Sequence, residues 1–173
     1  IGWCDWSSDV CSSDLMSQSA FTVRRLGPAD SADLLRLNVM FGAAFSDEPT
    51  YAQPLTESYV QELLGKDSIH ALIATADDEV IGGLVAYEFD KFERMQREIY
   101  IYDLAVAEAY RRRGVATALI EALQKIAAQR GAWVIFVQAD YGDDPAIALY
   151  EKLGSREEVL HFDIPVPKAE GNA

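Results

Sequence analysis

The chain has 173 residues, half of them hydrophobic and a quarter charged, with 28 acidic residues against 15 basic ones. This length predicts one domain with a hydrophobic core, and the composition excludes an intrinsically disordered protein. A net charge of −13 argues against nucleic acid as a partner, because phosphates require a basic face. No apolar run approaches the roughly 18 residues of a membrane span, so we expect no membrane partner either. The acidity fits a cationic partner, or simply a surface that favours solubility.

Residues 1–15 differ from the rest of the chain. They lack Lys and Arg, hold both cysteines and two of the three tryptophans, and show no secretory signal pattern. We interpret them as a non-native leader before a native start at Met16; the alternative is a short strand that docks on a neighbour. Without Cys4 and Cys11, the remaining sequence offers no disulfide, thiolate nucleophile or cysteine-based metal site, which fits a cytoplasmic location.

Hydrophobic periodicity predicts the elements of the first half of the chain. In order, we expect a strand over 21–26, a helix after Asp30 with an apolar stripe from Leu34 to Phe41, a break at 47–49, a short helix over 57–64, and a hairpin of strands 71–76 and 80–87. The short connection at 77–79 makes this hairpin antiparallel.

The second half alternates strands and helices. We expect a charged loop over 89–96, a strand over 98–106, a helix over 114–130 that ends at Gly131, a buried strand over 133–138, a helix over 145–153, a last strand over 159–164 and a polar tail over 165–173. With no internal repeat or linker, the pattern predicts a single α/β domain over 16–164 with a central mixed sheet.

Three consecutive arginines precede the helix that begins at 114. Arg111, Arg112 and Arg113 followed by Gly114 at a helix N-terminus predict an anion site, because the helix dipole and free backbone N–H groups face the ligand. No Gly-Lys-Ser/Thr follows, and two glycines of the dinucleotide fingerprint are absent, so neither of those loops is present. A solvated basic turn is the alternative.

Arg111-x-x-Gly114-x-Ala116 resembles the Arg/Gln-x-x-Gly-x-Gly/Ala pyrophosphate loop of the GCN5-related N-acetyltransferases (GNAT). Residues 104–106 match the strand where that superfamily splays its sheet, and 146–154 match its late helix, whose tyrosine faces the thioester sulfur. Within the superfamily the chain most resembles the aminoglycoside 3-N-acetyltransferases of the gentamicin and fortimicin type, through 98–106, 138–146 and 156–164. The departures are Ala116 for the second loop glycine and Asp143, where many members carry Asn.

The resemblance implies a mostly antiparallel sheet splayed at its fourth strand, acetyl-CoA as cosubstrate, no metal, and a homodimer. The cofactor-binding residues that it implies are Leu104, Ala105, Val106, Arg111, Arg112, Arg113, Gly114, Val115, Ala116, Thr117, Asp144, Ala146 and Tyr150. The function that it implies is acetylation of an aminoglycoside amino group, which confers antibiotic resistance.

Acetyl transfer to an amine needs a proton acceptor, a stabilised oxyanion and a proton for the departing thiolate. Asp103 is an acid inside an otherwise apolar strand, and we interpret it as the proton acceptor; a structural carboxylate is the alternative. We interpret Tyr150 as the proton donor, against the alternative of a core tyrosine at helical spacing from Ile147. A backbone N–H near Val106 would bind the oxyanion.

Acidic side chains also gather where an acceptor would bind. Acids that follow a buried strand lie at the usual ligand edge of an α/β sheet, and a polycationic sugar needs several such partners. The candidate substrate-binding residues are Glu88, Tyr102, Asp103, Asp140, Asp143, Asp144 and Glu157, with Asp90, Glu93 and Glu158 as further acids of this wall. Each acid alone also fits a solvated surface residue, and Tyr102 fits strand packing. His70 and His161 lack neighbouring ligand types, so we expect no metal site.

These observations favour an aminoglycoside 3-N-acetyltransferase that works by direct transfer in a ternary complex. An acetyltransferase for polyamines or protein amines would use the same cofactor loop. A CoA-binding module without turnover is the alternative from a different functional class.

Overall fold

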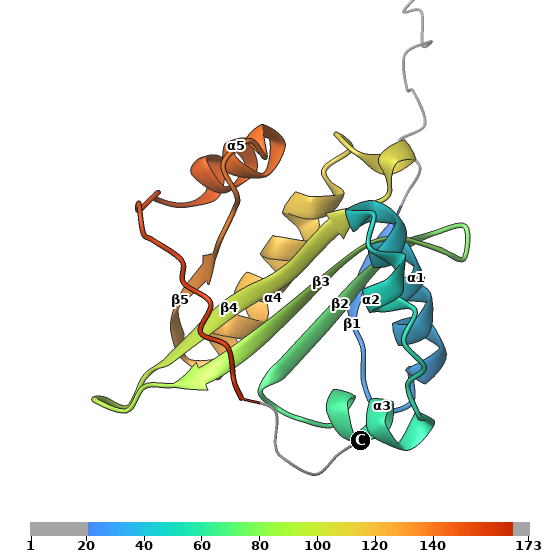
Figure 1. Cartoon of the computed structure of the whole chain (residues 1–173), viewed down its shortest axis with the longest axis horizontal. Coiled ribbons are helices and arrows are strands. Elements are labelled where there is room, and N and C mark those ends of the chain that lie inside the picture. The colour runs from blue at the N-terminus through green and yellow to red at the C-terminus, as the bar shows by residue number, and fades with distance from the viewer. Residues whose placement is uncertain (1–20, 168–173) are drawn as a thin grey trace, which may run out of the picture. The chain divides into compact units, whose positions relative to one another are not determined.

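The computed structural model describes residues 21–167 (Figure 1). The interpretation of residues 1–15 as a leader, with Met16 as the native start, lies outside the described residues, as does the tail from 168. The chain divides into two compact units, one up to Gln138 and one from Ala139, and each is described by itself.

The first unit is built on a five-stranded sheet in the order β1-β2-β3-β4-β5. The strands are β1 (Thr22–Arg25), β2 (Ile69–Ala76), β3 (Glu79–Asp90), β4 (Arg97–Val106) and β5 (Ala132–Val137). The first three pairings are antiparallel, and β4 with β5 is parallel. The predicted mixed, mostly antiparallel sheet is confirmed.

Helices cover both faces of this sheet (Figure 1). The helices α1 (Ser31–Phe45), α2 (Glu48–Tyr51) and α3 (Glu57–Leu64) lie on one face, and α4 (Val115–Arg130) lies on the other. Two adjacent glycines of β3 show the division: a β-carbon on Gly83 would overlap Leu37 of α1, and one on Gly82 would press on Val115 of α4. Missing side chains in β3 therefore let both layers approach the sheet closely.

The sheet opens between β4 and β5. Their parallel pairing joins 97–101 of β4 to 132–137 of β5, whereas β4 continues to Val106. Within the part of the chain that the structure describes, the edge of β4 from Tyr102 to Val106 has no strand beside it on the β5 side. The predicted splay at the fourth strand is confirmed, and it leaves backbone N–H and C=O groups available to a ligand.

The predicted break after the first helix is confirmed, since α1 ends at Phe45 and Ser46 adopts a left-handed conformation. The short helix α2 that follows was not predicted; it forms because Asp47 accepts a hydrogen bond from the Thr50 backbone N–H and Pro49 sits in the first turn, where proline is tolerated. One expectation about local structure is wrong. The strand expected over 159–164 is absent: this segment has no regular structure, and its apolar side chains are exposed. An alternating pattern forms a strand only where a neighbouring strand pairs with it.

The second unit contains α5 (Asp144–Leu153), which begins one residue before the predicted helix. The Asp143 side chain caps it by accepting a hydrogen bond from the Ala146 backbone N–H at 3.2 Å. None of the helices described between residues 21 and 167 has the length and apolar character to cross a membrane.

Candidate active site

A β-bulge in β4 brings Asp103 to the face of the sheet that carries α1. Val85 of β3 pairs with Asp103 and the next residue, Ala86, pairs with Ile101, so Tyr102 is the extra residue. A bulge redirects the side chains that follow it, and bulges gather beside active sites. Without it, the alternation of the strand would turn Asp103 towards α4.

Asp103 lines a cavity of about 180 Å³ beneath α1, α2 and α3. The cavity wall is apolar and aromatic: Leu34, Leu37, Phe41, Tyr51, Leu55, Tyr59, Leu63, Leu64, Ile69, Ala71, Val85 and Tyr87. Asn38 and Asp103 are the remaining lining residues, so Asp103 is the single charged group of the lining. No other carboxylate of this lining competes with Asp103 for a proton.

The environment of Asp103 suits a group that accepts a proton. Burial raises the pKa of Asp103, and a hydrogen bond from the Tyr51 hydroxyl to its Oδ1, at 2.7 Å, offsets part of that rise. A raised carboxyl pKa lies closer to neutral pH, where general-base catalysis is most effective. The role of Asp103 as proton acceptor stays a prediction, and its place in the cavity and its raised pKa favour that prediction.

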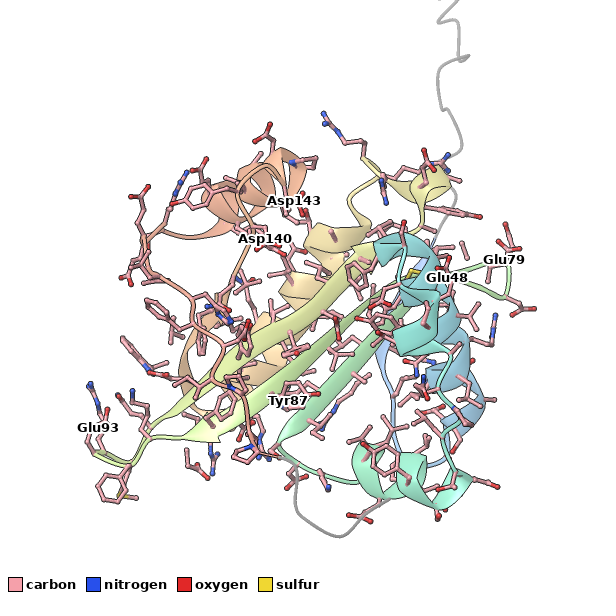
Figure 2. All side chains as sticks on the ribbon, viewed as in Figure 1. Glu48, Glu79, Tyr87, Glu93, Asp140 and Asp143 are labelled. Carbon is pink, nitrogen blue, oxygen red and sulfur yellow. The ribbon has the colours of Figure 1, made fainter. Side chains whose placement is uncertain are left out.

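Aromatic rings continue from the cavity across β3, β4 and β5. Tyr102 makes edge-to-face contacts with Tyr87 and with Tyr100, each at 5.8 Å between ring centroids, and Tyr100 stacks on Phe136 at 5.0 Å. Figure 2 shows Tyr87 projecting from β3. Tyr102 is 65 % exposed, so it is free to contact a ligand beside Asp103. Tyrosine faces attract cations, so this surface suits a protonated amine.

The loop before α4 has the conformation of an anion site. Arg112 and Gly114 both have positive φ angles, of 64° and 82°. Apart from its chain neighbours, no described residue has a heavy atom within 4 Å of the position that a β-carbon on Gly114 would take. No side chain caps the first turn of α4, which leaves its N–H groups for an external acceptor. Arg111 donates to the Val106 carbonyl at 3.1 Å, which ties the loop to the end of β4.

The remaining predicted cofactor residues of the first unit contribute through their backbone or line the same region. Val115 is buried against Gly82, so only its N–H is available to a ligand. Ala116 and Thr117 follow in the first turn of α4 and are partly exposed. Leu104 and Ala105 lie on the unpaired edge of β4, where the amides of an extended ligand can pair with the strand.

The second unit holds the predicted site residues that follow β5. Figure 2 shows Asp140 and Asp143 in the segment before α5, where the Asp143 backbone N–H donates to the Asp140 carbonyl at 3.2 Å. Asp144 and Ala146 lie in the first turn of α5, and Glu157, beyond the helix, is exposed. Asp143 therefore has a capping role, whatever it contacts in addition.

Tyr150 lies towards the C-terminal end of α5. Burial, with a smaller contribution from the negative charge of Asp143, raises the pKa of Tyr150 to about 12. Its phenol is therefore protonated at neutral pH, which is the form that a proton donor requires.

Glu88 does not belong to the acceptor wall predicted for it. Its side chain is 4 % exposed and is held by Arg130 at 2.9 Å, Arg97 at 3.2 Å and the fully buried His70 at 3.1 Å. From the sequence we expected Glu88 to lie beside a charged loop, but β3 continues to Asp90. The Glu88 carboxylate binds Arg130, Arg97 and His70, so it is not available to an acceptor. Asp90 and Glu93, also suggested for the wall, are paired with Arg97 and Lys91 respectively.

Each of the two histidines contacts a carboxylate of a neighbouring residue. Burial lowers the pKa of His70, so it is neutral beside Glu88, and the exposed His161 contacts Asp163 at 3.1 Å. Between residues 21 and 167, no group of three or more His, Cys, Asp or Glu side chains is placed to hold a metal ion.

Tyr51 was not among the predicted site residues. It follows the Asp-Glu-Pro stretch predicted as the break after the first helix, and a tyrosine on a four-residue helix leaves no periodic pattern to detect. The only available sign was an aromatic residue directly after a capped turn.

Comparison with known proteins identifies the family. Residues 36–155 match the model of the acetyltransferase (GNAT) family. The chain is 54 % identical to a solved aminoglycoside acetyltransferase, HMB0005, from an uncultured soil metagenomic sample, with a TM-score of 0.84 over 86 % of this chain and 99 % of that one. It is 27 % identical to meta-AAC0020, an aminoglycoside acetyltransferase from an uncultured soil metagenomic sample solved with sisomicin, with a TM-score of 0.79 over 85 % and 97 % of the two chains.

A curated relative is an N-alpha-acetyltransferase of Saccharolobus solfataricus, 26 % identical over 79 % of this chain and 81 % of its own. The splayed sheet, the arginine-glycine loop at the start of α4 and these similarities agree. The chain belongs to the GNAT family and is an acetyl-CoA-dependent N-acetyltransferase.

Proposed function

We propose that the protein acetylates an amino group of aminoglycosides, most specifically the 3-amino group of gentamicin-type antibiotics. The observation that carries the proposal is the 54 % identity to an aminoglycoside acetyltransferase over nearly the whole of that chain. The exposed aromatic surface at Tyr102 and the acids before α5 support it, because a polycationic sugar needs both ring faces and distributed carboxylates. Acetyl transfer would proceed directly, within a ternary complex.

On the acceptor side, Asp103 takes a proton from the attacking amine. The free nitrogen lone pair then attacks the thioester carbonyl carbon, and a C–N bond forms. The developing negative charge falls on the carbonyl oxygen, which a backbone N–H of β4 near Val106 stabilises from the unpaired edge of the strand.

On the cofactor side, the tetrahedral centre collapses and the C–S bond breaks. The departing thiolate takes the phenolic proton of Tyr150, and the acetylated nitrogen loses its second proton to water. The products are the neutral amide and the neutral CoA thiol, and Tyr150 is reprotonated from solvent while Asp103 releases the proton that it accepted. Leu104, Ala105 and Val106 hold the pantetheine arm, the arginine loop and the first turn of α4 hold the pyrophosphate, and Asp144 and Ala146 contact the cofactor from α5.

The proposed acceptor contacts are Tyr102 and Asp103 in the first unit, and Asp140, Asp143, Asp144 and Glu157 in the second. Acetylation removes one positive charge and a hydrogen-bond donor from the drug, and on this basis we expect resistance in cells that carry the enzyme. We further propose a homodimer, as the family resemblance implies, and a cytoplasmic location, which fits the lack of cysteine after residue 15.

Gly114→Ala tests the cofactor loop. An alanine at this positive φ costs about 1 kcal/mol of stability, and its methyl group would occupy the open space in front of the loop. We expect the Kd for acetyl-CoA, measured by calorimetry, to rise about tenfold or more. Gly131→Ala is the matched control, because Gly131 ends the same helix with a φ of 72° and equally open surroundings. It should lose stability without losing affinity; equal affinity losses in both variants would refute the loop assignment.

The second candidate function is acetylation of protein N-terminal amines, which the curated N-alpha-acetyltransferase relative favours. CoA release, followed with a thiol reagent, separates the candidates when gentamicin, fortimicin, kanamycin, spermidine and a short peptide are compared as acceptors. We expect the highest kcat/KM with gentamicin or fortimicin. Turnover with the peptide alone would overturn the aminoglycoside proposal, and binding of acetyl-CoA without turnover on any acceptor would indicate a non-catalytic binding module.

A further inference from the structure

Tyr51 is held in place by aromatic packing and not by its hydroxyl alone. Its ring lies 5.7 Å from the ring of Phe41 and 5.7 Å from that of Phe45, and those two rings stack at 5.5 Å. Gly42 of α1 lets α2 come close, since a β-carbon there would lie 3.3 Å from the Glu48 backbone and 3.4 Å from Tyr51 Cβ. Phe41, Gly42 and Phe45 of α1 thus hold the Tyr51 ring in one position.

From this position the Tyr51 hydroxyl reaches across the cavity to β4. It donates a hydrogen bond to Asp103 Oδ1 at 2.7 Å, the distance of a strong O–H···O⁻ contact. Burial, followed by the bond to Asp103, raises the pKa of Tyr51, so this hydroxyl keeps its proton and remains the donor. The bulge at Tyr102 sets the direction of the Asp103 side chain, and Tyr51 holds its carboxylate oxygen.

We propose that Tyr51 is a positioning residue for the acetyl-transfer reaction. It fixes one oxygen of Asp103 and stabilises its ionised form, which leaves the other oxygen free to accept a proton from the amine. This inference rests on the proposed role of Asp103 as the proton acceptor. Nothing in the sequence pattern assigned a function to Tyr51, and it acts through Asp103 without contact with the reacting atoms.

The groups that face this pair allow a clean pH experiment. From α3, β3 and β4 they are the tyrosines Tyr59, Tyr87, Tyr100 and Tyr102, and Asp47 acts on Tyr51 from the start of α2. The cavity residues that α1 contributes are Leu34, Leu37, Asn38 and Phe41, which carry no charge. Asp103 is the one carboxyl group of the cavity lining, so the titration of its labelled carboxyl carbon reports on this pair.

Tyr51→Phe keeps the packed ring and removes only the donor. A hydrogen bond to a charged group contributes enough to shift its pKa by about one unit, so we expect the Asp103 pKa to rise by about that amount. The acidic limb of kcat against pH should move upward equally, which lowers kcat about tenfold below the limb, while the KM for acetyl-CoA stays unchanged. Tyr59→Phe removes a hydroxyl from the same cavity that makes no hydrogen bond to Asp103, and it should leave the Asp103 pKa unchanged.

The pKa is measured directly by carboxyl ¹³C NMR of labelled aspartate, with the Asp103 signal assigned through Asp103→Asn. This readout does not depend on any acceptor. If the pKa of Asp103 in Tyr51→Phe equals that in wild type, the positioning role is overturned, even in a fully active enzyme. A wild type that is inactive on every acceptor, but in which Tyr51→Phe shifts the signal, would instead overturn the proposed function and retain the Tyr51–Asp103 pair.

Discussion

Asp103→Asn is expected to lower kcat with gentamicin by about 10²- to 10⁴-fold, the range that a general base contributes. Asparagine has nearly the same shape and its amide oxygen still accepts the Tyr51 hydrogen bond, so the cavity stays intact while the proton acceptor is lost. The Kd for acetyl-CoA should stay within a few-fold of wild type, because the arginine loop and the first turn of α4 are untouched. Stopped assays of CoA release, with calorimetry for the cofactor, measure both quantities.

Asp77→Asn provides the matched control. It makes the same chemical change in the exposed turn between β2 and β3, at a φ of 48° that asparagine tolerates. Its kcat should equal that of wild type. If Asp103→Asn also turns over gentamicin within a few-fold of wild type, Asp103 is not the proton acceptor.

Glu88→Gln is expected to lower the free energy of unfolding by about 1–2 kcal/mol at neutral pH. This is less than the cost of breaking a fully buried ion pair, because the Arg130 and Arg97 side chains are 28 % and 40 % exposed. The change leaves Arg130 and Arg97 facing a neutral amide beside the buried His70. Although burial raises the pKa of Glu88, hydrogen bonds from Arg130 and His70 bring it below its ordinary value, so the carboxylate is ionised at neutral pH. Its stabilising contribution is present above the ordinary carboxyl pKa and is lost as the pH falls below it. Urea denaturation at pH 7 measures the loss.

Glu93→Gln removes a carboxylate from an exposed position and should leave the free energy of unfolding close to that of wild type (Figure 2). The folded Glu88→Gln protein should keep the wild-type KM for gentamicin, because this carboxylate faces cations and not the acceptor. If Glu88→Gln leaves the free energy of unfolding unchanged but raises the KM for gentamicin, Glu88 contacts the acceptor after all.

The strongly periodic elements could be predicted from the sequence, because their own residues determine them. α3 has the predicted bounds. α4 begins at Val115, one residue after the predicted start, because Gly114 is its N-cap residue. Capping residues and apolar stripes are local properties, so a single chain displays them. The opposite case is the segment 159–164, whose alternating apolar residues predict a strand that forms only with a partner.

The candidate site was predictable only in part, for the same reason. The arginines and Gly114 form one contiguous motif, and Asp103 is conspicuous as an acid in an apolar strand. Tyr51 joins Asp103 across 52 positions of the chain, a contact that no local pattern displays. Glu88 misled the interpretation because its partners, Arg130 above all, lie far away in sequence.

The position of the acetyl group on gentamicin, read by two-dimensional NMR of the product formed with acetyl-CoA, tests the central claim most directly. We expect a single amide at the 3-amino group, formed at a rate that falls with Asp103→Asn. Unmodified gentamicin under conditions in which the same enzyme acetylates a peptide N-terminus would contradict it.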